Sequence, residues 1–295
     1  MKNGDVRKIG YRTLLFKESM IDFWRRYKKN RTALLGAYIL LFFYILAIFA
    51  PLIAPYDYYT LSLSDVLNPP NREHPMGTDH LGRDVLSGVV YGARVSLFIG
   101  FVSAVISVFV GIMIGSIAGY FGGRVDDVLM RFTEMFLVIP RFFLILIVVA
   151  IFGSNIWNVM VIIGLTAWPG NARLIRAQFL SLKSEEFIEA ARAGGASDTR
   201  IIFHHIMPNA IYPVVVNSSI LIAGSIITEA SLSFLGLGDP NIVSWGQMLN
   251  KAQIYLRVAW WMGVFPGILM FFTVLSFNLV GDGLNDALNP RLKEG

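Results

Sequence analysis

Uncharged apolar runs of about 20 residues are the feature that most constrains this chain, because such runs cross a lipid bilayer as helices. The first runs from Thr32 to Ala54, and no charged residue lies between Arg31 and Asp57. Hydrophobic residues make up 55% of the 295 positions and charged residues only 15%, against about 25% charged in soluble domains. Disorder is excluded as well, since it requires low hydrophobicity and high net charge. We therefore expect an all-α polytopic membrane protein.

Six membrane-spanning segments are predicted from these runs. They cover residues 32–54, 95–120, 135–152, a segment that starts near 156, 211–235 and 260–280. The fourth is the least regular, because Pro169-Gly170 interrupts it and Arg173 and Arg176 follow one turn apart. Either this helix continues past a kink into the cytoplasm, or it ends there and a surface helix begins. Five spans are the alternative, and they would place the two termini on opposite sides.

Positive charge is distributed unevenly over the segments outside the spans. With six spans both termini lie on one side, and that side holds 20 of the 25 Lys and Arg residues. Ten of them lie within the first 31 positions: Lys2, Arg7, Lys8, Arg12, Lys17, Arg25, Arg26, Lys28, Lys29 and Arg31. Since Lys and Arg are enriched in cytoplasmic loops, we expect both termini in the cytoplasm. The cluster does not indicate nucleic-acid binding, because no aromatic–basic surface motif accompanies it, and the following run is too long for a cleaved signal peptide.

The predicted spans divide the chain into five regions. They are a basic cytoplasmic arm (1–31), a first transmembrane helix (32–54), an external polar loop (55–94), a core of five transmembrane helices (95–282) and a cytoplasmic tail (283–295). Within the core, three glycines repeat at every fourth position: Gly111, Gly115 and Gly119. Such a stripe lets a second helix approach closely, so it predicts helix packing.

Signatures of enzymatic chemistry are absent from the sequence. There is no phosphate-binding Gly-Lys-Ser/Thr loop, no His-Glu-x-x-His and no Gly-x-Ser-x-Gly. The lack of cysteine excludes thiolate metal sites and cysteine nucleophiles. Ionisable groups in the spans are few, namely Glu134, Arg141 and Glu229, and they lie toward span ends, whereas gradient-driven carriers usually place them near mid-membrane. We expect a non-catalytic transport subunit powered by a partner, with a secondary carrier as the alternative and a structural or regulatory membrane protein as a third.

The cytoplasmic segment of residues 184–208 is the most informative. Ser184-Glu185-Glu186 can open a helix, with acids at the positive end of its dipole, and Gly194-Gly195 can end it. Ser197-Asp198 can cap a second short helix over residues 199–207. Two short helices with apolar faces would form a compact knob that fits a cleft on another protein. The alternative is an interfacial helix that lies on the lipid headgroups.

The same segment resembles the EAA loop of permease subunits in binding-protein-dependent ATP-binding-cassette (ABC) importers. The match consists of Glu189-Ala190-Ala191, then Gly195, then Ile206-Met207-Pro208, with Met207 where leucine is usual. Residues 74–97 and 228–246 are similar to the dipeptide/oligopeptide/nickel permease group. The three stretches in this order make the resemblance very specific, and the chain looks like the second (C-type) permease of that group.

The resemblance implies a type I ABC importer permease fold in a prokaryotic inner or plasma membrane. It also implies partners: a homologous second permease, two ATPase subunits that bind ATP and Mg, and an external substrate-binding protein. The knob would be a coupling helix seated in a groove of the ATPase, with Glu189 available to an Arg or backbone donors, and Gly195 would allow the sharp turn. No cofactor is expected in this chain. The substrate would be a short peptide, with nickel or an oligosaccharide as alternatives within the group.

Several polar residues outside the knob have two interpretations. An external set is either a metal site or a group of turn and helix caps, and the caps are the expectation: Glu73, His74, Asp79, His80 and Asp84. Glu229 either lines the pathway or a gate, or pairs with an Arg. Asn217, Ser218 and Ser219 either face a polar path or bond a neighbouring helix. Arg141, which follows Pro140, has no assigned role.

Overall fold

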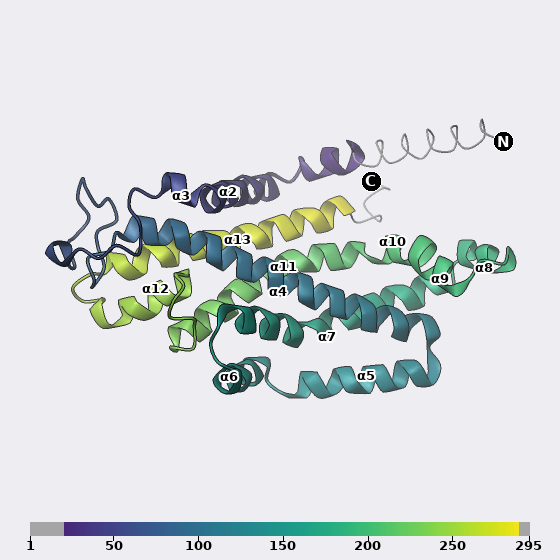
Figure 1. The fold of residues 1–295 in the computed structure, drawn as a ribbon. Coiled ribbons are helices and arrows are strands. Elements are labelled where there is room, and N and C mark those ends of the chain that lie inside the picture. The colour runs from purple at the N-terminus through teal and green to yellow at the C-terminus, as the bar shows by residue number, and fades with distance from the viewer. Residues whose placement is uncertain (1–20, 289–295) are drawn as a thin grey trace, which may run out of the picture.

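The computed structural model describes residues 21–288, which form an elongated helical bundle (Figure 1). The long helices are α2 (Arg31–Ile48), α4 (Val85–Phe121), α7 (Ile156–Lys183), α11 (Tyr212–Phe234) and α13 (Trp261–Leu288). The shorter ones are α3 (Ala50–Ile53), α5 (Gly123–Val138), α6 (Arg141–Phe152), α8 (Glu186–Ala193), α9 (Asp198–Arg200), α10 (Met207–Ala210) and α12 (Trp245–Ala252). Three further turns complete the order: η1 (Leu63–Asp65), the π-helical η2 (Ile201–Ile206) and η3 (Gln253–Tyr255).

Four of the described helices are long and apolar enough to cross a membrane, namely α2, α4, α11 and α13. The helices α5 and α6 meet this criterion only together, and a bend of 82° separates them. The six predicted spans correspond to these five units and to α7, which does not meet the criterion. Much of α7 packs against α4 inside the bundle, so contact with protein rather than lipid accounts for its more polar sequence.

Two helices differ in extent from the predicted spans. The helix that contains the second predicted span begins at Val85, because Asp84 accepts a hydrogen bond from the Ser87 backbone nitrogen at 2.7 Å and caps the helix. The third is not one helix: Pro140 separates α5 from α6, and only α6 lies wholly within the predicted 135–152.

The ends of the chain also differ from expectation. The last helix, α13, continues to Leu288 and so includes the start of the predicted tail. The basic residues from Lys2 to Lys17 and residues 289–295 lie outside the described part of the chain. The start of α2 and the end of α13 lie at the same end of the bundle as α8, and the loop before α4 lies at the opposite end (Figure 1). The two ends of the described chain therefore lie at the same end of the bundle.

The glycine stripe lies at the contact between α4 and α7. A Cβ added at Gly111 would lie 2.4 Å from Asn171 Cβ, and one added at Gly115 would lie 2.3 Å from the Ala172 carbonyl oxygen. One added at Gly119 would meet Phe179 Cβ at 2.6 Å. The two backbones therefore approach closely along several turns, and α4 and α7 form one rigid pair.

Candidate functional site

The knob, here residues 184–208, sits on the ends of α4 and α7. Its helix α8 buries Ile188 completely, and Ile201 and Ile206 of η2 are also fully buried. These side chains belong to one apolar cluster with Phe179 of α7 and Tyr120 of α4. A helix of eight residues is marginal by itself, so this cluster stabilises α8 and connects it to the two long helices.

Polar contacts add to this attachment. The Tyr120 hydroxyl donates a hydrogen bond to Asp198 Oδ1 at 2.5 Å, and Lys183 Nζ donates to the Tyr120 carbonyl oxygen. Below the knob, the Arg176 guanidinium makes two hydrogen bonds to the Asp126 carboxylate, at 2.5 and 2.6 Å, and so joins α7 to α5. The knob is therefore attached to α4 and α7, and α7 in turn is joined to α5.

Gly195 makes the turn that ends α8. Its φ of +78° lies in the left-handed region, and its backbone nitrogen donates to the Arg192 carbonyl oxygen at 3.0 Å. No atom lies within 4 Å of a Cβ added there, so the requirement for glycine at Gly195 is conformational rather than steric.

The predicted second helix of the knob does not end near Pro208. Residues 198–210 continue as α9, the π-helical η2 and α10, and α11 follows directly. Pro208 is the second residue of α10 and directly follows the π-helical turn. The wider π turn before it continues the chain past a proline that the sequence pattern treats as a stop. Helix α8 begins at Glu186, with Glu185 rather than Ser184 at the N-cap.

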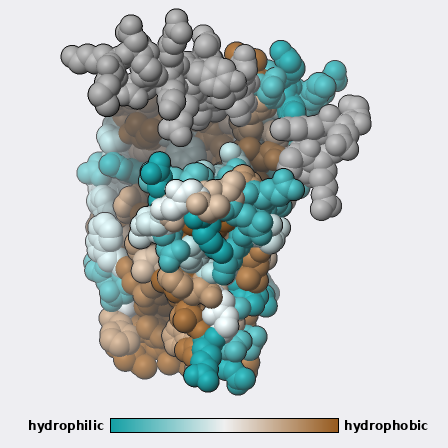
Figure 2. Space-filling model, turned by 90° about the vertical axis from the view of Figure 1, so that its right-hand side faces the viewer, coloured by the Kyte–Doolittle hydropathy of each residue, from teal (hydrophilic) through white to brown (hydrophobic). Residues whose placement is uncertain are grey.

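The outer surface of the knob remains open. Glu189 and Ala190 are exposed, Ala191 and Met207 are half-buried, and Pro208 is exposed. No residue between 21 and 288 forms an ion pair with Glu189. Next to α8, a surface hollow of about 520 Å³ is lined by Thr199, Arg200, Phe203 and His204. The end that carries the knob faces the viewer in Figure 2, where hydrophilic side chains gather in the centre and apolar ones lie below them.

Of the pathway candidates, Glu229 is the most buried, with 4% of its surface exposed. Its Oε1 accepts hydrogen bonds from the Ser233 and Ser244 hydroxyls, both at 2.7 Å, and its Oε2 has no partner among the described residues. Among residues 21–288 no arginine pairs with it. Glu229 instead connects α11 to the first turn of α12.

Asn217 joins a chain of amides across three helices. Its Nδ2 donates to Asn171 Oδ1 at 2.9 Å, and Asn171 Nδ2 donates to the Ser107 hydroxyl at 3.1 Å. Ser218 bonds the Val215 carbonyl of its own helix. The structure therefore brings Asn217 into helix packing, and it does not bring Asn217, Ser218 and Glu229 together in one site.

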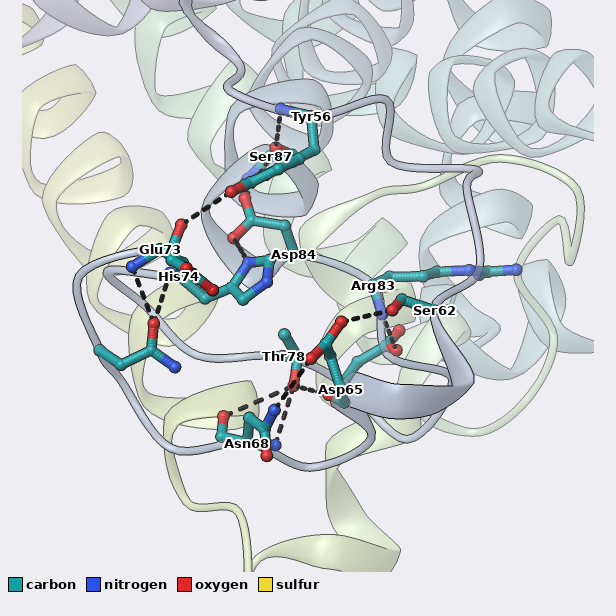
Figure 3. Close-up of polar contacts among 12 residues, drawn as sticks. Tyr56, Ser62, Asp65, Asn68, Glu73, His74, Thr78, Arg83, Asp84 and Ser87 are labelled. Carbon is teal, nitrogen blue, oxygen red and sulfur yellow. Dashed lines mark hydrogen bonds and ion pairs between the residues drawn. The ribbon is translucent and has the colours of Figure 1, made fainter.

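Two external acidic residues, Asp79 and Asp84, act as caps, and Asp84 is labelled in Figure 3. Asp84 accepts from the Ser87 nitrogen and hydroxyl and lies 2.9 Å from His74 Nδ1, and Asp79 Oδ1 accepts from two backbone nitrogens. Burial and the nearby Asp79 carboxylate raise the pKa of Tyr58 to about 12, so this phenol stays protonated. Within residues 21–288 no group of three or more His, Asp or Glu residues is arranged to hold a metal ion.

Sequence reasoning missed Tyr120 and Lys183, which attach the knob, and the Arg176–Asp126 pair, which joins α7 to α5. Tyr120 and Asp198 are 78 positions apart, and Arg176 and Asp126 are 50 positions apart. No local motif marks either contact. A signal is present only for Arg176, as a charged residue directly after an apolar run.

Comparison with known proteins places the chain among transport components. Residues 111–294 match the family described as binding-protein-dependent transport system inner membrane component, and residues 19–70 match the N-terminal transmembrane domain of oligopeptide transport permease C. The oligopeptide transport system permease protein OppC of Bacillus subtilis is 36% identical over 293 residues, which cover 99% of this chain and 95% of OppC. The glutathione transport system permease protein GsiD of Escherichia coli is 42% identical over 278 residues, which cover 92% of this chain and 90% of GsiD.

Solved structures with the same fold are also transporters. The inward-facing MetNI methionine ABC transporter has a chain that matches with a TM-score of 0.56 at 20% identity, over 68% of this chain and 97% of that one. An amino acid ABC transporter crystallised with histidines matches with a TM-score of 0.52 at 16% identity, over 67% of this chain and 92% of that one. At these identities the likeness establishes the fold alone.

Proposed function

The chain belongs to the family of binding-protein-dependent transport system inner membrane components, as a permease of the OppC, DppC and GsiD type, and from this we propose that it imports short peptides. Its fold is that of a type I ABC importer permease, and the chain is a non-catalytic subunit. The substrate proposal is supported by relatives whose names specify oligopeptides, dipeptides and glutathione. Those names do not favour the alternatives of nickel and oligosaccharide.

The assembly that we propose contains this chain, a homologous second permease, two ATPase subunits that use ATP and Mg, and an external binding protein. This chain would form half of the translocation pathway. The excess of Lys and Arg on the knob side supports a cytoplasmic position for both termini and for the knob in a bacterial cell membrane.

The observation that supports the proposal most is that α8 has an exposed face and is attached to α4 and α7 by its buried face. The exposed face of α8 is free for a partner, while its buried face is fixed by Ile188 to α4 and α7. When two ATPase subunits close around ATP, they would push two such knobs together. The glycine contact between α4 and α7 would convert that push into rocking of whole helices between inward-facing and outward-facing states.

Replacement of Glu189 by alanine tests this role. A carboxylate that receives a charge-assisted hydrogen bond from the ATPase contributes roughly 1.5–3 kcal/mol to the contact, and its loss lowers coupling by about tenfold or more. We expect Glu189→Ala to lower peptide uptake and peptide-stimulated ATP hydrolysis to that extent, with normal amounts of protein in the membrane.

The matched control is Glu186→Ala, an exposed glutamate one turn earlier on the same helix, which we expect to retain most of the uptake. Gly195→Val provides a second variant, because a β-branched side chain is strained at positive φ. Unchanged uptake in both Glu189→Ala and Gly195→Val, at normal protein levels, would contradict the proposed function of the knob.

A further inference from the structure

Arg141 is a positive charge held inside the bundle. It is the first residue of α6, directly after the 82° bend that separates α6 from α5. Its side chain turns toward α7, where Nη2 donates to the Ile163 carbonyl oxygen at 3.0 Å and Nε donates to the Thr166 hydroxyl at 3.3 Å. At 1.5 Å per residue, Ile163 lies about 10 Å along α7 from Ile156. The guanidinium therefore lies against the interior of α7, about two turns from its first residue, rather than at its end.

The charge of Arg141 is not balanced by a carboxylate of the described chain. None of the three ion pairs found among residues 21–288 includes it, and both of its partners on α7 are neutral. A neutral glutamine also donates hydrogen bonds, so these two contacts do not explain a positive charge. An ionisable group placed within a membrane span is costly and usually marks a ligand or ion pathway.

The turn between α5 and α6, directly before Arg141, is exposed and not helical. Val138 is 82% exposed, Ile139 is 46% exposed and Pro140 is exposed as well. Between Val138 and Arg141 the chain is not helical. At membrane depth, non-helical backbone is tolerated beside protein or a water-filled cavity but not against lipid. In Figure 1 the α5–α6 pair lies on one flank of α7, away from α2 and α13. The exposed non-helical turn leads us to expect that this flank borders the pathway or the second permease rather than lipid.

We propose that Arg141 binds the side-chain carboxylate of an acidic peptide on its way through the transporter. Two N–H groups of the guanidinium fix it to α7, and its remaining N–H groups present a planar, permanently charged fork that suits a carboxylate. The inference rests on the proposed import of peptides and names the substrate charge that this permease favours. Arg141 thus selects among the peptides that the external binding protein delivers.

The test is uptake of three tripeptides of equal length, Ala-Glu-Ala, Ala-Gln-Ala and Ala-Lys-Ala, by cells that contain the complete transporter. The affinity of the purified binding protein for each peptide is measured separately, and the permease variants leave it unchanged because it is another chain. Arg141→Gln removes the charge, Arg141→Lys keeps it, and Arg131→Gln removes an exposed arginine of α5 as the matched control.

We expect Arg141→Gln to lower the ratio of Ala-Glu-Ala to Ala-Lys-Ala uptake by about tenfold, since one charge-assisted contact is lost for the anionic peptide alone. Arg141→Lys should retain most of the ratio, and Arg131→Gln all of it. An equal fall for all three peptides, or no change, would overturn the inference, because a purely structural contact with α7 does not sense peptide charge. Failure of the unaltered transporter to take up any of the three would overturn the proposed peptide import itself.

Discussion

Replacement of Gly115 by leucine is expected to remove almost all folded protein from the membrane. The new Cβ alone would lie 2.3 Å from the Ala172 carbonyl oxygen and 3.0 Å from Ile175 Cβ. Neither atom can move aside by a side-chain rotation, because one is a backbone oxygen and the other a Cβ of α7. The two helices α4 and α7 must therefore separate along the glycine contact. Overpacking usually costs about 1–3 kcal/mol and more where backbone must move, which is a large share of a marginal stability of roughly 5–15 kcal/mol.

The measurement is the amount of variant in washed membranes, with Gly224→Leu as the matched control. Gly224 also lies inside a membrane helix, α11, but no atom lies within 4 Å of a Cβ added there. We expect the Gly224 variant to accumulate normally and the Gly115 variant to fall below about a tenth of the parent amount. Equal accumulation of the two variants would show that the α4–α7 contact is not needed for stability.

Replacement of Ile188 by aspartate is expected to release the knob while the bundle remains folded. Ile188 is fully buried among Phe179, Ile201 and Ile206, where an unpaired carboxylate costs several kcal/mol. The cheapest response is local opening of α8, because an eight-residue helix has little stability of its own. A released knob cannot transmit force, so peptide uptake should fall to about a hundredth of the parent rate or less.

Limited proteolysis from the cytoplasmic side separates this effect from global unfolding. We expect Ile188→Asp to be cut rapidly within residues 184–208 and to retain the parent's cleavage pattern elsewhere. Phe187→Asp is the control for stability, since the neighbouring Phe187 is 44% exposed and a charge there stays in water. A knob that resists protease in the Ile188 variant would contradict the anchoring role of that cluster.

The spans were predictable where an apolar run has clear ends. The run 211–235 became α11 (Tyr212–Phe234), and the run 32–54 became α2 with the short α3. The start of α4 at Val85 was not predictable, because its first turns carry Gly, Ser and Arg and their burial depends on packing against helices far along the chain. A single helix over 135–152 was expected because one proline changes the mean hydropathy of a run very little. Pro140 nevertheless interrupts the helix, since proline lacks a backbone N–H.

The position of the knob was predictable, but its attachment was not. Acids before an apolar turn and two glycines after it mark α8 locally, and the positive φ of Gly195 follows from the same pattern. The Tyr120–Asp198 hydrogen bond joins residues 78 positions apart, and only the folded chain brings them together. For Arg141 the sequence shows an intramembrane charge, whereas its neutral partners on α7 and the absence of a described counter-ion are visible only in three dimensions.

The central claim is that the exposed face of α8 contacts an ATPase in the cytoplasm, and a single cysteine tests it most directly. The natural chain has no cysteine, so Ala190→Cys places one thiol on this face, and Leu63→Cys, which replaces a residue 85% exposed, places one at the opposite end. We expect a photoactivatable maleimide on the thiol of the Ala190→Cys variant to cross-link the ATPase subunit, and a membrane-impermeant maleimide to reach that thiol only in inside-out vesicles. Modification of the same thiol from outside intact cells, or no ATPase adduct from the assembled transporter, would contradict the account.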